Sequence, residues 1–567
     1  MDPERPGNQV NRVAPRKGLT RRHFLTLLSA GTGTAALGGF LSGCTAAPTP
    51  SSPTAAPAVS SPAPPAATKP PATAAAPAPT VAAGPKKGGV LVVAAETNPT
   101  GLDPAKVTSL ASQSVIELTY DSLFELDPNL SVKPRLCKTY DTPDEKTYVF
   151  HLEENVKFSD GSDLTSEDVK FTIERIMDPK TASPRATLFK QVDGVEAVDR
   201  NTVRLTTKTP FAPLINMLAW SFNQIVSKKF VESKGGNIDQ VTMGSGPFKL
   251  TEYVPDRTLK FERNPYYWRK DRPLLDGMLW KVIPDDQGRV AALRAKDVDD
   301  AWFLDPKVAD LFRGSSDYIL YEVPVLTHGT TWINCSKPPL DNPKVRQAMS
   351  YAINRQEFVD TVLFGKGEVT GPIPAPEKEW ALPVSEYPSY KQDVAKAKAL
   401  LAEAGVPNGF SVTLKVSPQY VLDTGNAQVL QRQLRAIGID VRLESVEWGN
   451  LLSAWTKSDF EMLNLLMLGQ PDPDGYTWGR FHSQSAGNYA KIKDADLDVL
   501  LDKQRTTIDR AARKQVLADA QRKIVELSPM LFYYCYYVWG IVRPYVKGMT
   551  PMANSSGIYL ANVWLDK

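Results

Sequence analysis

The feature that most restricts the fold is a run of alternating strand and helix patterns between residues 411 and 468. Apolar runs at Ser411–Val416, Ile439–Val446 and Phe460–Leu468 predict strands. Helical spacing at Ala427–Ile437 and Gly449–Lys457 predicts the helices between them. A βαβαβ run favours a mostly parallel sheet with helices on its faces. Ligands of such sheets bind outside the carboxyl ends of the strands, so the residues after the last strand are a candidate site.

The rest of the body also mixes strands with helices, so the predicted fold class is α/β. One helix is expected to begin at the cap and first-turn proline of Asn342-Pro343, and another at Val394. The aromatic block Phe532–Trp539 is interpreted as a buried strand. Further strands are expected at Gly88–Glu96, Thr147–Glu153 and Asn201–Thr206, and as a hairpin at Phe248–Val254 and Thr258–Glu262.

The first 86 residues read as an export signal and a tether. Arg21 and Arg22 precede an apolar stretch without acidic residues, which is typical of a twin-arginine signal. The run Leu41–Cys44 resembles a lipobox, so residues 1–43 are expected to be removed and Cys44 to be acylated. An uncleaved signal anchor is the alternative. Residues 44–86 are expected to be a disordered tether, because positions 46–85 hold 12 Pro and 15 Ala.

Charge and motif content argue against several classes of protein. The formal charge is +3, but the basic excess precedes Gly88, so the body is acidic and is not expected to bind nucleic acid. The body has no Walker A, HExxH or GxSxG motif. Its histidines and cysteines are scattered without metal-ligand spacing. We therefore expect no cofactor, no metal site and no enzymatic activity.

Two pairs of acidic residues carry only weak signals. The segment Asp472-Pro-Asp474-Gly475 faintly resembles the start of a calcium loop, but Ser483 stands where the glutamate of such a loop belongs. The adjacent acids Asp299 and Asp300 are interpreted as part of a solvated loop.

Several motifs together resemble those of family 5 extracellular solute-binding proteins, the receptors of oligopeptide, dipeptide and nickel ABC importers. The most diagnostic stretch is Thr147–Gly161, followed by Leu164–Val169. The resemblance extends from about Lys87 to near the C-terminus. Other matching segments are Tyr120–Glu125, Gly244–Leu250, Glu262–Trp268, Asn334–Asp341, Val345–Ala348, Tyr351–Asn354, Ala395–Gly405 and Leu434–Val441.

The resemblance implies a two-lobed periplasmic-binding-protein type II fold (cluster C) with an extra subdomain in the first lobe. The lobes of such proteins close around a solute by a hinge motion. The first lobe is expected at residues 87–325, with the extra subdomain at about 130–240. The second lobe is expected at 326–525, and residues 526–567 are expected to return to the first lobe.

The resemblance also implies which segments line the solute cleft. These are the loop around residue 108, the segment 220–223 and the exit of the strand that ends at Leu468. Some nickel-class relatives have an arginine in the second segment, where this chain has none. The predicted ligand-binding residues are Thr108, Ser109, Trp220, Asn223, Gly469, Asp472, Asp474 and Trp478.

Peptide-class relatives hold the ligand's α-amine with an acidic residue that falls at Gly469 in this chain. Asp472 and Asp474 lie close by in the sequence, and two interpretations of them stay open. They contact the ligand, or they cap the turn that follows the strand.

The expected function is a lipid-anchored receptor on the extracytoplasmic face of a bacterial membrane, which delivers a peptide-like solute to an ABC permease with separate ATPases. A monomer is expected. The alternatives are a receptor for an oligosaccharide or another non-peptide solute, a surface hydrolase, and a chaperone-like or sensory protein. Indole rings stack on sugars, and about two of six tryptophans are expected in the cleft. These are Trp220, Trp302, Trp332, Trp380, Trp448 and Trp478.

Overall fold

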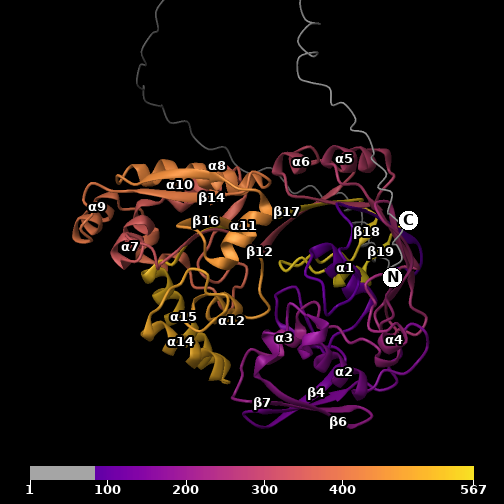
Figure 1. Ribbon diagram of the computed structural model, residues 1–567. Coiled ribbons are helices and arrows are strands. Elements are labelled where there is room, and N and C mark those ends of the chain that lie inside the picture. Colours follow the sequence, from indigo (N-terminus) through magenta and orange to yellow (C-terminus); the bar gives the residue numbers. More distant parts are fainter. Residues whose placement is uncertain (1–83) are drawn as a thin grey trace, which may run out of the picture. The chain divides into compact units, whose positions relative to one another are not determined.

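The structure is a computed structural model that describes residues 84–567 (Figure 1). The expected signal residues Arg21 and Arg22, the expected lipidation site Cys44 and nearly all of the tether lie outside the described residues. No helix within residues 84–567 is both long enough and apolar enough to cross a membrane.

The main element of the described chain is an eleven-stranded mixed sheet. Ten strands follow one path, and the eleventh, β13 (Gly367–Val369), pairs with β17. The path runs in the order β15 (Asp440–Ser445), β14 (Ser411–Val416), β16 (Met462–Met467), β12 (Ile319–Ile333), β17 (Met530–Val542), β11 (Asp300–Phe303), β1 (Val90–Ala95), β10 (Gly277–Val282), β9 (Thr258–Arg263) and β8 (Phe248–Val254).

The long strands β12 and β17 belong to both halves of this sheet. The first half of β12 pairs with the end of β17, and its second half pairs with the start of β17 and with β16. The β12–β17 register shifts between Pro324 and His328. A shift of this kind interrupts the hydrogen-bond ladder, so the connection between the halves is least regular at this point. The aromatic block Phe532–Trp539 lies within β17, which confirms that it forms a strand.

The second half of the sheet confirms the predicted βαβαβ run. β14 pairs in parallel with β15 and with β16. The connecting helices are α10 (Val421–Arg435) and α11 (Trp448–Lys457). α10 begins six residues before the predicted start, because polar Asp423 and Asn426 interrupt the apolar pattern but are buried against the sheet.

Helices surround this second half of the sheet. The predicted cap is confirmed at α7 (Pro343–Ala352), where the Asn342 side chain accepts a hydrogen bond from the Lys344 backbone N–H at 3.0 Å. The helix predicted from Val394 is confirmed as α9 (Val394–Glu403). The others are α8 (Arg355–Val362), α12 (Pro473–Tyr476), α13 (Trp478–Phe481), α14 (Ala495–Thr506) and α15 (Arg510–Leu527).

In the first half of the sheet, β1 lies between β10 and β11 and is parallel to both. Its apolar side chains form the main core of this half together with the predicted β8–β9 hairpin, which is confirmed. After β17, the chain adds the strand pair β18 (Val546–Lys547) and β19 (Trp564–Leu565) and the short helix η6 (Ile558–Asn562). The helices of this half are α1 (Leu110–Thr119), α3 (Leu214–Ala219), α4 (Lys228–Ser233), α5 (Asp286–Ala295) and α6 (Pro306–Asp310).

A separate four-stranded antiparallel sheet lies between residues 137 and 207, with its own apolar core. α2 (Ser166–Met177) packs against it, and the β2–β3 hairpin, Phe124–Leu126 and Val132–Pro134, precedes it. Its strands follow the order β4 (Cys137–Asp144), β5 (Thr147–Leu152), β7 (Thr202–Thr207) and β6 (Val192–Asp199).

Candidate functional site

A cavity of about 290 Å³ lies at the carboxyl ends of β1 and β11. We call it the strand-end cavity. Residues 93–97 and 302–304 contribute the strand ends, and residues of α1 and of the segment 551–560 form walls. Val323 of β12 and Val538 of β17 also line it, so it reaches the strands that join the two halves of the sheet. Ligands of parallel sheets bind at this edge, outside the carboxyl ends of the strands.

The lining of the strand-end cavity is aromatic and acidic. Glu96 and Asp300 contribute carboxylates, and no described residue that lines the cavity is Lys, Arg or His. Glu96 is exposed and forms no ion pair with any residue in 84–567. The aromatic side chains of the lining are Trp280, Trp302, Phe303 and Tyr559.

Asp300 is the most unusual group in this lining. It is 1% exposed, and its Oδ1 has no hydrogen-bond partner within the described chain. Burial raises the pKa of Asp300 to about 7, a hydrogen bond from Trp302 opposes this rise, and the neighbouring Asp299 adds to it. The interpretation of these two acids as a solvated loop is wrong. Both are buried, because β11 begins at Asp300 and pairs with β1 and β17.

Trp302 owes its position to a glycine in the neighbouring strand. Trp302 of β11 pairs with Gly540 of β17, and a Cβ at residue 540 would lie 2.7 Å from the indole ring. The glycine therefore leaves room for the ring to lie across β17 beside the cavity. A second indole, Trp280, is 7% exposed and its Nε1–H has no acceptor among the described residues.

A buried glutamate fastens the wall formed by the segment 551–560. Glu117 of α1 accepts hydrogen bonds from the Ser556 hydroxyl at 2.9 Å and from the Gly557 backbone N–H at 2.8 Å. It also accepts from Gln113 at 3.1 Å and from Ser221. Burial raises the pKa of Glu117, and these donors oppose the rise. Glu117 therefore connects α1, the loop after α3 and the cavity wall.

Four predicted ligand-binding residues belong to the first half of the molecule and are not in the lining of this cavity. Thr108 is exposed, and Ser109 caps α1 by accepting from the Ser112 backbone N–H at 3.2 Å. The next residue, Leu110, does line the cavity. Trp220 is half-buried at the end of α3, and Asn223 is buried and donates to the Met217 carbonyl at 2.6 Å.

The other four predicted residues follow β16 in the second half of the sheet. Gly469 lies against β12, where a Cβ would come 2.8 Å from the Leu326 side chain. The Leu326 backbone N–H donates to the Ala553 carbonyl at 3.0 Å, which connects this point to the segment that forms the cavity wall. Trp478 is half-buried, donates to Asp502 at 2.9 Å and stacks on His482.

Asp472 and Asp474 have protein partners for their carboxylates. Asp472 caps α12, pairs with Arg513 and accepts from Asn216 of α3 at 2.9 Å. Asp474 accepts from Gln504 at 2.5 Å and pairs with Arg505 at 3.1 Å. Burial raises the pKa of Asp474 to about 6. The turn-capping interpretation describes the contacts of Asp472, which also link the two halves of the molecule.

Asp423 and Arg480 are among the buried charged groups of the second half that the sequence did not single out. Both carboxylate oxygens of Asp423 lack a hydrogen-bond partner in the described chain, and burial raises its pKa to about 7. Arg480 donates to the Leu468 carbonyl and contacts His328, both at 3.2 Å, and has no carboxylate within ion-pair distance among residues 84–567. Burial lowers the pKa of Arg480 to about 10.

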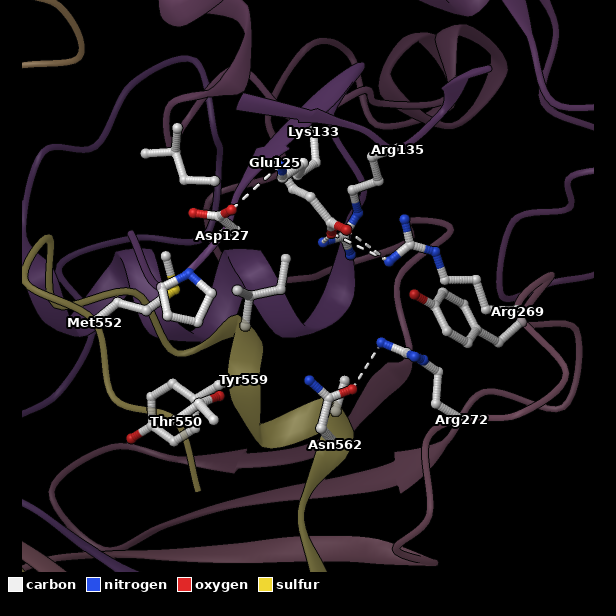
Figure 2. Close-up of a pocket in the computed structure, with 15 residues that line it drawn as sticks. Glu125, Asp127, Lys133, Arg135, Arg269, Arg272, Thr550, Met552, Tyr559 and Asn562 are labelled. Carbon is white, nitrogen blue, oxygen red and sulfur yellow. Dashed lines mark hydrogen bonds and ion pairs between the residues drawn. The ribbon is translucent and has the colours of Figure 1, made fainter. Parts of the chain in front are cut away.

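A smaller cavity of about 170 Å³ also borders the η6 segment and shares Met552 and Tyr559 with the first (Figure 2). We call it the ion-pair cavity. Glu125 accepts from Arg135 and Arg269, both at 2.9 Å. The Lys133 ammonium lies 3.4 Å from Asp127. Arg272 donates to Asn562 at 2.7 Å, and Arg135 also pairs with Asp121 outside the lining.

The tryptophan expectation can be compared with these linings. Of the six named tryptophans, Trp302 lines the strand-end cavity, whereas Trp332 and Trp380 are buried in cores. Trp280 also lines the cavity and was not among the six. Its position in a strand of alternating pattern was the only signal for it.

The described residues contain no group of three His, Cys, Asp or Glu side chains that could hold a metal ion. Cys137, Cys335 and Cys535 are free thiols. Burial raises the pKa of each of the three, to about 11 for Cys335 and about 12 for the other two, so a thiolate is disfavoured at all of them.

Comparison with known proteins shows consistent relatives. Residues 131–488 match the family of bacterial extracellular solute-binding proteins, family 5 Middle. The glutathione-binding protein GsiB of Salmonella typhi is 34% identical over 361 residues, which make up 63% of this chain and 70% of that protein.

Solved structures show the same fold. AgaA from A. tumefaciens R10, in complex with agropinic acid, has a TM-score of 0.72 at 28% identity, with 84% of this chain and 99% of that chain covered. DppA from Helicobacter pylori, in complex with the peptide STSA, has a TM-score of 0.71 at 26% identity, with 85% and 99% covered. The expected periplasmic-binding-protein type II architecture is thereby confirmed. These relatives bind different solutes.

Proposed function

Because this chain belongs to the bacterial extracellular solute-binding proteins of family 5, we propose that it captures a peptide-like solute between its two lobes and delivers it to an ABC permease with separate ATPase subunits. Its relatives are solute-binding transport proteins and not enzymes. The peptide class is supported by the relatives that bind glutathione and the peptide STSA.

The observation that carries this proposal is the strand-end cavity. It lies at the carboxyl ends of parallel strands and reaches β12 and β17, the strands shared by both halves of the sheet. All of its lining residues belong to the proposed first lobe or to the segment that returns to it, so a solute bound there would lie beside the irregular β12–β17 pairing, where a hinge would bend, and would meet the second lobe when the lobes close. Binding that prefers the closed form stabilises it by mass action.

The proposed site extends beyond the cavity lining. In this proposal Thr108, Ser109, Trp220 and Asn223 border the solute from the first lobe. The strand exit from residue 469 to 478, with Gly469, Asp472, Asp474 and Trp478, borders it from the second. The proposed lobes are residues 87–325, with a subdomain at about 130–240, and residues 326–525, with a return segment at 526–567.

We also propose that the protein is a monomer held at the extracytoplasmic face of the membrane by an acylated Cys44. Residues 44–86 would tether the body to that lipid. The acidic body and the family membership support a solute as its partner and not a nucleic acid.

The test measures binding of glutathione, the peptide STSA, agropinic acid and a maltooligosaccharide to residues 84–567, by thermal shift and then by calorimetry. Trp302→Ala should weaken solute binding, and Trp448→Ala, at the start of α11 and outside the cavity lining, serves as the matched control. A rise in melting temperature with STSA, abolished by the first variant only, supports the proposal. Binding of the oligosaccharide alone would select a carbohydrate receptor, which the two cavity indoles Trp280 and Trp302 favour.

A further inference from the structure

We infer that the strand-end cavity receives the positively charged end of the solute, a primary ammonium group that binds Asp300 and Glu96 beside the ring of Trp302. This inference rests on the proposed function and narrows its substrate class to amine-bearing solutes. It assigns the amine to the first lobe, at Glu96 directly after β1 and at Asp300, the first residue of β11.

The first argument for an ammonium group is the net negative charge of the cavity lining. Glu96 and Asp300 are the ionisable acids of the lining, and no described lining residue is basic. Neither carboxylate forms an ion pair within residues 84–567. A cavity with uncompensated negative charge and low-dielectric walls attracts a cation and repels an anion.

The second argument compares Asp300 with its neighbour Asp299, whose carboxylate has partners inside the protein. Asp299 accepts from the Val92 backbone N–H at 2.9 Å, accepts from Tyr545, and lies 3.8 Å from the Lys567 ammonium. Asp300 has the same side chain one position later, is 1% exposed and leaves Oδ1 without a partner in the described chain. The strand alternation turns Asp299 toward these partners and Asp300 toward the cavity. Trp302 is the one donor to this carboxylate among the described residues, and a buried Oδ1 without a donor is costly, so a bound ammonium would supply the donor that Oδ1 lacks.

The aromatic side chains carry the third step. Trp302, on the same face of β11 as Asp300, lines the cavity together with Trp280 and Tyr559. Indole and phenol rings attract ammonium groups through their negative faces. The rings also bury the apolar part of a solute, so the site suits an amine attached to an apolar chain. Glutathione, whose α-amine carries its own neighbouring carboxylate, fits this charge pattern less well.

The experiment compares probes that differ only in the amine. Calorimetry on residues 84–567 uses the peptide STSA against N-acetyl-STSA, and phenethylamine against 2-phenylethanol. We expect the free amine of each pair to bind at least about tenfold more tightly, because acetyl or hydroxyl leaves Asp300 uncompensated. Asp300→Asn should remove this preference, and Glu96→Gln should reduce it.

The matched control is Asp496→Asn, an acid on α14 with an 89% exposed side chain and far from the lining in sequence and contacts. It should leave both preferences unchanged. Glu96 is exposed, so Glu96→Gln folds and keeps the inference testable even if Asp300→Asn does not fold.

Each outcome separates this inference from the proposed function. If STSA and its acetylated form bind equally, the amine site is wrong and the peptide receptor stands. If phenethylamine is preferred over the alcohol while STSA fails to bind, the amine site stands and the peptide class is wrong. If neither free amine is preferred, or if Asp300→Asn and Glu96→Gln weaken both members of a pair equally, the inference is overturned.

Discussion

The two cavities that border η6 differ in how the charged side chains of their linings are neutralised. In the ion-pair cavity, each basic side chain of the lining has an acidic partner, and Arg135 and Arg269 share Glu125 (Figure 2). In the strand-end cavity, Glu96 and Asp300 share the lining with apolar and aromatic groups and with no base. The two cavities share Met552 and Tyr559, but only the lining of the ion-pair cavity has its acids paired with bases.

This difference separates a structural cavity from a binding cavity. Charges that hold a fold together are neutralised inside the protein, since an unpaired buried charge destabilises it. Charge that stays uncompensated at a strand end raises the free energy of the empty protein, and a ligand of opposite sign can lower it. Four substitutions break or sharpen the comparison.

The largest effect is expected from the ion-pair cavity. Arg135→Met would leave the buried Asp121 without a guanidinium and Glu125 with Arg269 alone, because the Arg135 side chain is 1% exposed and pairs with both acids. We expect a loss of about 3–5 kcal/mol in the free energy of unfolding, measured by urea denaturation. Solute affinity of the folded fraction should not change. A loss below about 1 kcal/mol would show that these pairs do not hold the cavity together.

In the strand-end cavity, removal of a charge by Asp300→Asn is expected to raise the stability of the protein instead of lowering it. The pKa of Asp300 is raised from 3.8 to about 7, so the native state binds a proton more readily than the unfolded chain. The contribution of Asp300 to stability is therefore full below about pH 4 and is lost as the pH rises to about 7. Asp300→Asn does not titrate, and its stability relative to the native sequence should rise across this window.

At pH 8 we expect this variant to be more stable than the native sequence by on the order of 1–3 kcal/mol in the absence of solute, while its affinity for an amine falls. Melting temperatures between pH 4 and pH 8 give the measurement. The charge of Asp299 acts on Asp300, Tyr321 and Tyr559 respond to the charge of Asp300, and Trp302 acts on it through a hydrogen bond. A variant that is less stable at every pH would contradict the uncompensated carboxylate.

A smaller effect on stability is expected for Gly540→Ala. The added Cβ would lie 2.7 Å from the Trp302 ring, and the ring has the cavity beside it to move into. We expect a cost of about 1 kcal/mol in stability and a clear loss of solute affinity, read by denaturation and calorimetry on one sample. Gly314→Ala adds a Cβ that meets no neighbour but strains the backbone at a φ of +78°, so it tests whether a loss of stability alone lowers solute affinity. Unchanged affinity in Gly540→Ala would remove Trp302 from the site.

The smallest effect is expected for Glu96→Gln. Glu96 is exposed, so its charge is screened by salt and its neutralisation should hardly change stability. We expect the association rate of an amine-bearing solute to fall about two- to threefold at low salt, and the difference to vanish at high salt. Stopped-flow fluorescence of the cavity tryptophans measures it. An association rate that Glu96→Gln leaves unchanged at low salt would remove Glu96 from the amine site.

Much of the fold followed from local pattern. Periodicity predicted β14, α11 and β16 within two residues of their ends, and the Asn342-Pro343 pair predicted the start of α7. The helix α10 was predicted too short, because its first turns carry polar residues that are buried only through contact with the sheet.

The candidate site followed less well from the sequence. Asp299 and Asp300 read as a solvated loop because adjacent acids usually face water, and nothing local says that the chain there enters a sheet between β1 and β17. The partner of Asp472 was equally hidden, since Arg513 is 41 residues away and reaches it only through the packing of α15.

The sequence by itself determined the elements of this protein and its family, because both depend on residue types at short, regular spacing. The tertiary structure decided which charges are neutralised and which are left for a solute. Whether a charge is neutralised depends on side chains that come from distant segments. Lys567 reaches Asp299, for example, whereas no basic side chain of the described chain pairs with Asp300. Charge compensation depends on distances in the folded chain and not on spacing along the sequence, so only the tertiary structure reveals it.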